Sequence, residues 1–174
     1  MFSTVVLGLG SNWGDRRAQL KAAMTALGRV LEEMNTSPIY ENPPLLPEGA
    51  PEFWNKPYLN MVIVGHTKLS PQKLLSAIQS IENRLGRQER GHWGPREIDI
   101  DILAYEDQVI RDEDLTVPHQ EMLRRSFVMV PFANILPYWK YPNEGPYKGK
   151  TAEELVKLFG HQKDKQLRRY EVSA

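Results

Sequence analysis

The order of two hydrophobic periods along the first part of the chain constrains its fold more than any other feature. Apolar residues alternate, or form short β-branched runs, over residues 4–9, 58–66 and 97–105. They recur at three- and four-residue steps over residues 20–34 and 74–85. Because a period of two indicates a strand and a period near 3.6 indicates a helix, these ranges predict strands interspersed with helices.

Local signals predict where the first elements begin and end. The first strand, residues 4–9, closes on a turn at residues 10–12, and the helical stripe that follows continues to Met34. A brief, partly β-branched stretch at residues 35–40 predicts a second strand, which precedes a long loop that runs to Lys56.

The second helix and the strand after it carry the clearest pattern. Ser70 and Pro71 are a typical N-cap and first-turn pair, and the helix is expected to stop at Gly86. The strand at residues 97–105 alternates, with isoleucines on one face and acids on the other. The two sets are Ile98, Ile100 and Ile102 opposite Glu97, Asp99 and Asp101.

This order of elements predicts the fold class. Strand, helix, strand, strand, helix, strand is typical of the ferredoxin-like split βαββαβ sheet, an α+β fold with both helices on one face of an antiparallel sheet. The other face is then available for ligands. Residues 120–135 and a capping box at 151–154 predict further, peripheral helices, which would place helices on both sides. We expect a loop at 137–150 and a frayed tail at 162–174, within one domain of residues 1–174.

Charge and composition narrow the classes of partner. The 22 basic and 22 acidic side chains cancel, so a phosphate-bearing ligand must be held by a local cluster, and nucleic acid is not expected as a partner. The absence of cysteine excludes a disulfide framework and thiolate metal sites. No apolar run approaches the ~20 residues of a membrane span, and the start lacks a signal-peptide pattern. We therefore expect a cytoplasmic monomer without a membrane partner.

Two carboxylates lie two residues apart in the strand at 97–105. Asp99 and Asp101 therefore share one face at a spacing of ~6 to 7 Å, where one cation, or two, can bridge them. Hard carboxylate oxygens suit Mg²⁺, which takes its remaining ligands from water and from phosphate oxygens. Taken alone, the pair also fits an exposed strand face that carries acids.

The loop before this strand concentrates positive charge and glycine. Residues 86–96 contain three arginines, three glycines and a tryptophan. Arginine forks bind phosphate oxygens bidentately and stabilise charge that develops between two phosphates, so Arg87 and Arg96 are the predicted catalytic arginines. A solvated loop with a packing tryptophan is the structural alternative. With Asp99 and Asp101 directly after it, the loop favours a nucleoside triphosphate site.

Aromatic and amide side chains predict a neighbouring site for a flat heteroaromatic ring. Tyr58 and Phe127 offer aromatic faces, and Asn60 is an amide in an apolar strand, where it needs a hydrogen-bond partner. His119 lies on the segment that should return to the aspartate strand, and it is predicted to contact phosphate. Core packing is the alternative for each aromatic residue, and a structural role is the alternative for the histidine.

Five motifs follow one another between residues 5 and 131. The most specific is Trp93-Gly94-Pro95-Arg96-x-Ile98-Asp99-Ile100-Asp101-Ile102-Leu103. The others are Gly10-Ser11-Asn12-x-Gly14-Asp15, Tyr58-Leu59-Asn60, Val117-Pro118-His119 and Arg125-x-Phe127-Val128. In this order they resemble the 6-hydroxymethyl-7,8-dihydropterin pyrophosphokinase family.

The resemblance implies transfer of the β,γ-diphosphate of ATP to the hydroxymethyl group of 6-hydroxymethyl-7,8-dihydropterin in folate biosynthesis, with release of AMP. It implies that Asp99 and Asp101 ligate two Mg²⁺ ions and that Arg87 and Arg96 contact the phosphates. The residues it implies for binding ATP, the co-substrate, are Gln79, Glu82, Arg87, Trp93, Arg96, Ile102, Thr116 and His119. Those it implies for binding the pterin are Pro44, Leu45, Tyr58, Asn60, Trp93, Arg125 and Phe127.

Two departures and two rival functions accompany the resemblance. Glu89 stands where the family often has a second basic residue, in a loop one residue short that continues with Arg90, and the loop at 46–56 is long. A two-metal nucleotidyl transferase or nuclease is the rival enzyme, against which the zero net charge argues. An RNA-binding module is the rival without catalysis, but Asp99 and Asp101 would repel a nucleic-acid backbone.

Overall fold

The strand-forming runs assemble into one antiparallel sheet. In the computed structural model, which describes residues 1–171, β1 (Ser3–Ser11) lies between β4 (Tyr58–Thr67) and β5 (Asp99–Tyr105). The other edge of β4 pairs with β2 (Glu32–Thr36) and β3 (Tyr40–Asn42). The start of β5, with its two aspartates, therefore lies beside the end of β1. The start of β4 lies on the other side of β1, at the same end of the sheet.

A last short strand extends the sheet beyond β3. β8 (Arg168–Arg169) pairs with β3, so the order across the sheet is β5-β1-β4-β3-β8, with β2 beside β4. The N–H of Tyr170 also donates to the carbonyl of Ile39 at 2.8 Å. Part of the segment 162–174, which we expected to fray, is thus bonded to the sheet edge, and residues 172–174 lie outside the described part of the chain.

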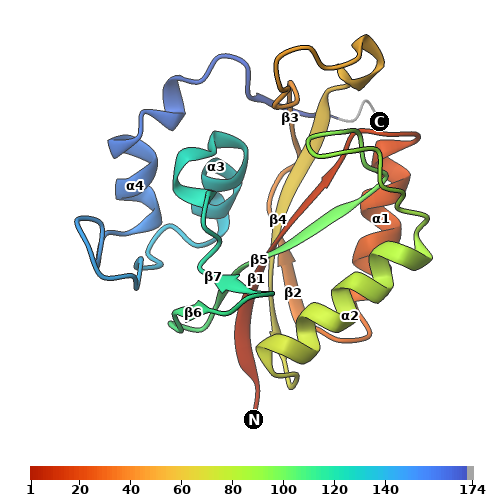
Figure 1. Cartoon of the computed structure of the whole chain (residues 1–174). Helices are drawn as coiled ribbons and strands as arrows, with labels where there is room; N and C mark the ends of the chain where they lie inside the picture. The colour runs from red at the N-terminus through yellow and green to blue at the C-terminus, as the bar shows by residue number, and fades with distance from the viewer. Residues whose placement is uncertain (172–174) are drawn as a thin grey trace.

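Two helices cover one face of the sheet, as the sequence predicted (Figure 1). α1 (Arg16–Leu27) begins at the carboxylate cap of Asp15, and α2 (Pro71–Arg84) begins at the predicted hydroxyl cap of Ser70. Their apolar stripes pack on the odd-numbered residues of β1 and β4 and on the isoleucines of β5. Fully buried members of this core include Leu7, Leu20, Leu27, Ile63, Leu74, Ile78 and Ile98.

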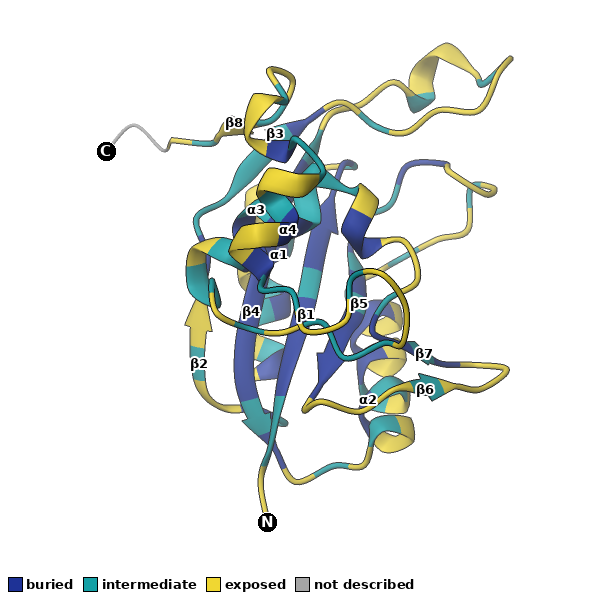
Figure 2. Ribbon diagram, turned by 90° about the vertical axis from the view of Figure 1, so that its left-hand side faces the viewer, coloured by how far each residue is buried: buried dark blue, intermediate teal, exposed yellow. Residues whose placement is uncertain are grey.

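The opposite face of the sheet is divided into an apolar part and a polar part. α3 (Ser126–Ile135) and α4 (Ala152–Leu158) cover the apolar part (Figure 2). Phe132 and Leu155 are fully buried there, in a second core with Val62. We had expected peripheral helices, and this was wrong, because α3 and α4 bury the apolar residues of that sheet face. The polar part lies where β4 and β5 begin.

The first helix is shorter than its pattern predicted. α1 ends at Leu27 with Gly28 as its cap, and Leu31 is buried from the following turn. The strand expected at 35–40 is instead the two short strands β2 and β3. The end of α1 was predicted too late because Leu31 is buried in the same core as the helical residues although it lies in a turn. Its apolar side chain therefore continued the helical spacing in the sequence.

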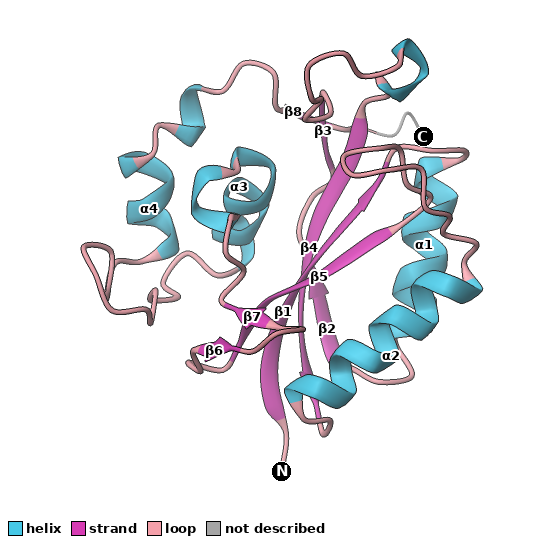
Figure 3. Cartoon of the chain, in the orientation of Figure 1, coloured by secondary structure: helices cyan, strands magenta, loops and turns pink. Residues whose placement is uncertain are grey.

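A small hairpin returns the chain to β5. β6 (Ile110–Arg111) pairs with β7 (Thr116–Val117), and the N–H of His119 then donates to the carbonyl of Leu103 at 3.0 Å (Figure 3). This contact places His119 beside the aspartate strand, as the sequence predicted. Within residues 1–171, no helix combines the length and the apolar character that crossing a membrane requires.

Candidate active site

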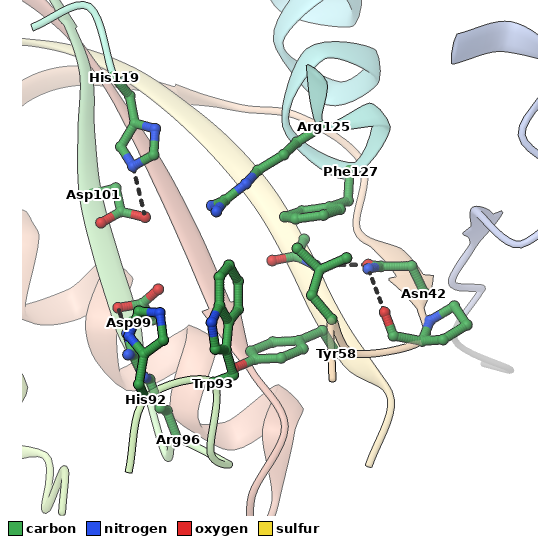
Figure 4. Close-up of a pocket in the computed structure, with 13 residues that line it drawn as sticks. Asn42, Tyr58, His92, Trp93, Arg96, Asp99, Asp101, His119, Arg125 and Phe127 are labelled. Carbon is green, nitrogen blue, oxygen red and sulfur yellow. Dashed lines mark hydrogen bonds and ion pairs between the residues drawn. The ribbon is translucent and has the colours of Figure 1, made fainter. Parts of the chain in front are cut away.

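Two cavities meet at the start of β5, and Figure 4 shows the residues that line one of them, the aromatic cavity described below. Both are lined by His92, Trp93, Asp101, His119 and Arg125. The first, here named the aromatic cavity, has a volume of about 200 Å³ and is also lined by Asn42, Pro43, Leu45, Tyr58, Asn60, Arg96, Asp99 and Phe127. The second, the larger cavity, has a volume of about 620 Å³ and is also lined by Leu75, Ile100, Ile102, Asp114, Leu115, Thr116, Gln120 and Glu121.

The two aspartates have different neighbours. Oδ1 of Asp99 lies 2.9 Å from Nη1 of Arg96 and 3.2 Å from Nη1 of Arg87, so both predicted catalytic arginines converge on one oxygen. Oδ2 of Asp101 faces Nε2 of His119 at 3.9 Å, which is too long for a hydrogen bond. Asp99 is therefore neutralised by the protein itself, whereas Asp101 is not.

The carboxyl group of Asp101 is electrostatically crowded. Burial by the surrounding walls, followed by the charges of Asp99 and Glu82, raises its pKa to about 8. Its side chain is still 41% exposed, because it faces the cavities. Carboxylates that repel each other in this way favour a cation between them. Residues 1–171 contain no group of three or more His, Asp or Glu side chains arranged to hold a metal, so such a cation needs further oxygens from water or substrate.

Glu82 and Gln79 lie on α2 but line neither cavity. Glu82 is buried; its carboxylate accepts the N–H of Ile100 at 3.0 Å and forms an ion pair with Arg87. Burial raises the pKa of Glu82, against the opposing effects of these two partners. Gln79 is exposed one helical turn after Leu75, which does line the larger cavity. Contact of Gln79 and Glu82 with a nucleotide stays a prediction.

His119 is held as a neutral donor. Its Nδ1 accepts the N–H of Glu121 at 3.2 Å, which leaves the proton on Nε2, toward the aspartates. Burial, followed by the charge of Arg125, lowers the pKa of His119. Ile102 and Thr116, which were predicted to contact ATP, line the larger cavity together with it.

A pair of amides crosses the floor of the aromatic cavity. Nδ2 of Asn60 donates to Oδ1 of Asn42 at 2.7 Å, and Nδ2 of Asn42 donates to the carbonyl of Pro43 at 3.0 Å. The buried Asn60 thus has the partner that its apolar strand requires. A Cβ atom at Gly10 would lie only 2.6 Å from Oδ1 of Asn60, so glycine is needed there for the amide to fit. Burial, followed by the charge of Asp99, raises the pKa of Tyr58 to about 12, which keeps its phenol neutral.

Trp93 and Arg125 form the wall shared by the two cavities. The guanidinium carbon of Arg125 lies 5.8 Å from the ring centroids of both Trp93 and Phe127, within cation–π range (Figure 4). Trp93 has a positive φ of 69° and is 38% exposed. An aromatic side chain held in this conformation beside a guanidinium can contact a ligand in either cavity.

The loop at 86–96 is anchored at its centre by Arg90. Its guanidinium forms a two-point pair with the carboxylate of Glu97 and lies 4.5 Å from the ring centroid of Trp13. Gly91 packs on Trp54, because a Cβ atom there would lie 3.0 Å from that ring. Arg90 therefore holds its loop to Glu97 and Trp13 and lines neither cavity, while Gly91 is the residue that meets the loop at 46–56.

The structure brings most of the predicted residues together and adds others. Pro43 and Leu45 line the aromatic cavity but Pro44 does not, because neighbouring residues of an extended segment point to opposite sides. Sequence reasoning missed several lining residues, among them Asn42, His92, Leu75, Asp114, Leu115, Gln120 and Glu121. The need of Asn60 for a polar partner was the one signal that could have directed attention to Asn42.

Comparisons with known proteins agree with this geometry. Residues 6–137 match the family model described as 7,8-dihydro-6-hydroxymethylpterin-pyrophosphokinase (HPPK). A 2-amino-4-hydroxy-6-hydroxymethyldihydropteridine pyrophosphokinase of Aquifex aeolicus is 42% identical over 158 residues, which are 90% of this chain and 96% of the relative. A folate synthesis bifunctional protein of Chlamydia muridarum is 42% identical over 159 residues, or 89% of this chain, but the match spans only 35% of that longer relative.

Solved structures show the same fold at lower identity. The wild-type HPPK-DHPS crystal structure of Plasmodium falciparum superposes with a TM-score of 0.74 at 17% identity, covering 99% of this chain and 49% of that one. At this identity the likeness concerns the fold alone. The match to the family model and the 42% identity to the Aquifex aeolicus relative agree with the fold and with the cavities around the aspartates. The chain therefore belongs to the 7,8-dihydro-6-hydroxymethylpterin-pyrophosphokinase family.

Proposed function

We propose that this chain transfers diphosphate from ATP to 6-hydroxymethyl-7,8-dihydropterin, giving AMP and the pterin diphosphate in folate biosynthesis. One observation carries the proposal: Asp101 lines both the aromatic cavity, with its amide floor, and the larger, more open cavity, and Asp99 lines the aromatic cavity beside it. A flat ring in the first cavity and a triphosphate in the second would bring acceptor hydroxyl and phosphate together at these carboxylates.

Asp99 and Asp101 are suited to Mg²⁺ by their chemistry. They offer hard oxygen ligands on one strand face, and their mutual repulsion is relieved by a divalent cation. We propose that they hold two Mg²⁺ ions, with water and phosphate oxygens as the remaining ligands. When bound, these ions would stabilise negative charge on the phosphates and on the acceptor oxygen.

The proposed phosphate contacts come from side chains that already point to this place. Arg87 and Arg96 converge on Asp99, so each can turn from that carboxylate to a phosphate oxygen once its charge is met by a cation. The Nε2 proton of His119 is available to an oxygen of ATP. We assign the larger cavity to ATP, with Ile102 and Thr116 in its wall.

The proposed pterin contacts combine stacking and edge recognition. Tyr58, Trp93 and Phe127 supply ring faces, and the paired amides of Asn42 and Asn60 supply donors and acceptors for a heterocyclic edge. Arg125 and Leu45 lie at the same cavity. A neutral phenol at Tyr58 suits a neutral ring, because no charge needs to be desolvated when the ring binds.

We further propose that the sheet is the ferredoxin-like split arrangement and that residues 1–174 are a single pyrophosphokinase domain. In support, β4 separates β1 from the strands that follow α1, and β1 separates β4 from the strand that follows α2. Each helix thus connects two parallel strands that have a third strand between them, as in a split βαβ unit. A monomer, and a cytoplasmic location, stay predictions.

The product of the reaction tests this proposal directly. The purified chain, incubated with ATP, Mg²⁺ and 6-hydroxymethyl-7,8-dihydropterin, should release AMP and pterin diphosphate in equal amounts. Chromatography of the nucleotides and fluorescence of the pterin measure both products. Release of ADP, or no dependence of AMP release on the pterin, would contradict the proposal.

A further inference from the structure

Residues 161–170, here named the C-terminal brace, run from the end of α4 to the sheet edge at β3 (Figures 1 and 3). The proposed reaction uses none of these residues. The brace bonds to the rest of the protein at two places, one next to Arg125 and one next to Asn42. Arg125 lines the aromatic cavity just before α3, and Asn42 lines it at the end of β3. These two sides of the cavity are here called its two walls.

The first contact holds both sides of Arg125. Nε2 of the buried His161 lies 2.7 Å from the carbonyl oxygen of Leu123 and donates to it. The carboxylate of Asp164 accepts the hydroxyl proton of Ser126 at 2.5 Å. Because Leu123 and Ser126 flank Arg125 in the chain, these two hydrogen bonds limit how far the guanidinium and the start of α3 can move.

The second contact ends directly before Asn42. β8 pairs with Tyr40 and Glu41, and the N–H of Tyr170 donates to the carbonyl of Ile39. The next side chain along β3 is that of Asn42, which receives the hydrogen bond from Asn60. The brace therefore pairs with the strand that presents the amide floor of the cavity.

The brace also forms part of the surface next to the aromatic cavity. Asp164 and Gln166 line a third cavity of about 310 Å³. This third cavity shares six lining residues with the aromatic cavity: Asn42, Pro43, Leu45, Trp93, Arg125 and Phe127. If the brace is displaced, residues that line the proposed ring site can therefore shift with it.

We propose that the brace sets the distance between the two walls of the aromatic cavity, and that Asp164 is a positioning residue for acceptor binding. The inference rests on the proposed function, because the acceptor in question is the pterin. Asp164 lines neither of the two cavities assigned to the substrates and acts through Ser126, which begins α3 and precedes Phe127. Loss of this hydrogen bond releases one wall while the other stays paired to the sheet.

The substitution Asp164→Ala tests this inference. We expect the KM for the pterin to rise about fivefold, the effect of losing one hydrogen bond that holds the site, with kcat changed by less than about twofold. The KM for ATP should rise by a clearly smaller factor, because Phe127, which follows Ser126, lines the aromatic cavity and not the larger one, although Arg125 lines both. Asp164→Asn keeps an acceptor for Ser126 and should recover most of the pterin affinity.

Two further variants separate positioning from general stability. Ser126→Ala should reproduce the rise in pterin KM, and the double variant should add little to it, because both changes remove the same hydrogen bond. Glu153→Ala is the matched control: it breaks an exposed ion pair with Lys157 on α4 and leaves the brace intact. Its pterin KM should equal that of the wild type.

The outcomes distinguish the brace from the proposed function. If the wild-type chain neither binds 6-hydroxymethylpterin, followed by its fluorescence, nor turns over the dihydropterin, both proposals fail. If the wild-type chain binds and turns over the pterin, but Asp164→Ala and Ser126→Ala keep the wild-type pterin KM, only the proposal about the brace is refuted. An equal rise in the KM for ATP, or additive effects in the double variant, would also overturn it, since each indicates a general loss of structure.

Discussion

The two ends of the candidate site satisfy their polar groups in different ways. At the ring end, neutral partners are already matched: Asn60 donates to Asn42, and the phenol of Tyr58 stays protonated. At the phosphate end, the charges are not evenly paired: Asp99 contacts two arginines, whereas Asp101 lies near the carboxylates of Asp99 and Glu82. The first end is preformed for a neutral ring, whereas the second is arranged for charges that arrive with the ligands.

This difference indicates what each substitution should cost. Changes at the phosphate end should remove transition-state stabilisation, because the charged groups there are placed to meet charges that arrive with the ligands. Changes at the ring end should weaken pterin binding and leave ATP binding intact. Four predictions test this contrast, in order of decreasing effect.

Asp101→Asn should have the largest effect. We expect kcat to fall about a thousandfold, because a hard ligand for the cation is lost, while the free energy of unfolding without Mg²⁺ is unchanged or higher, because repulsion with Asp99 is removed. AMP release and urea denaturation measure the two quantities. A variant that unfolds readily would show that the carboxylate has a structural role, and one that keeps wild-type turnover would show that the reaction does not need it.

Arg96→Ala should have the next largest effect. We expect kcat/KM to fall about a hundredfold through the loss of charge-assisted hydrogen bonds to phosphate. Arg96 also lines the aromatic cavity, but its guanidinium is paired with Asp99, so the affinity for 6-hydroxymethylpterin should fall by a clearly smaller factor. Steady-state kinetics and pterin fluorescence measure these values. Arg29→Ala, on an exposed residue after α1, is the matched control and should behave as the wild type. An equal loss of pterin affinity would remove the contrast between the two ends.

Gly10→Ala should act on the ring end alone. The added Cβ would lie 2.6 Å from Oδ1 of Asn60 and displace the amide from Asn42, so we expect pterin affinity to fall about tenfold with ATP affinity unchanged. Gly8→Ala is the comparison variant, because its Cβ would meet the flexible end of Leu103 at 3.3 Å. Calorimetric titration with each ligand measures both affinities. Equal effects of the two alanines would argue that the amide pair is unimportant.

Glu97→Gln should have the smallest effect, because it removes a partner that supports the loop at 86–96 and does not remove a proposed contact with substrate. We expect kcat/KM to fall about two- to fivefold and cleavage within residues 86–96 by a protease to become faster, as Arg90 loses its partner. A loop that resists protease as well as the wild-type loop would show that Trp13 alone holds Arg90.

The effect of Glu97→Gln should also depend on pH. Although burial opposes it, hydrogen bonding to Arg90 and the charge of that arginine leave the pKa of Glu97 below its usual value of 4.5. The ion pair therefore contributes stability above that value and loses its contribution as pH falls below it. Thermal unfolding of both proteins should differ at pH 7 and converge in acid. A difference that persists in strong acid would contradict this assignment.

Local patterns were predicted well because each depends on neighbours in the chain. Alternation placed Asp99 and Asp101 on the face opposite the isoleucines, and the cap at Ser70 began α2 as expected. The end of α1 was placed too late, since Leu31 continued the helical spacing from a turn. Composition suggested a frayed tail from residue 162, but pairing of β8 with β3 depends on a strand far away in sequence.

By itself, the sequence determined the alternation of strands and helices, the shared face of the two aspartates and the arginine-rich loop before them. These features follow from backbone periodicity and from charge, which act within a few residues. Only the tertiary structure decided which partners met: Asn42 with Asn60, Arg90 with Glu97 and Trp13, and the brace with α3 and β3. Such contacts join segments that the chain brings together only when its sheet has formed, and therefore no local pattern encodes them.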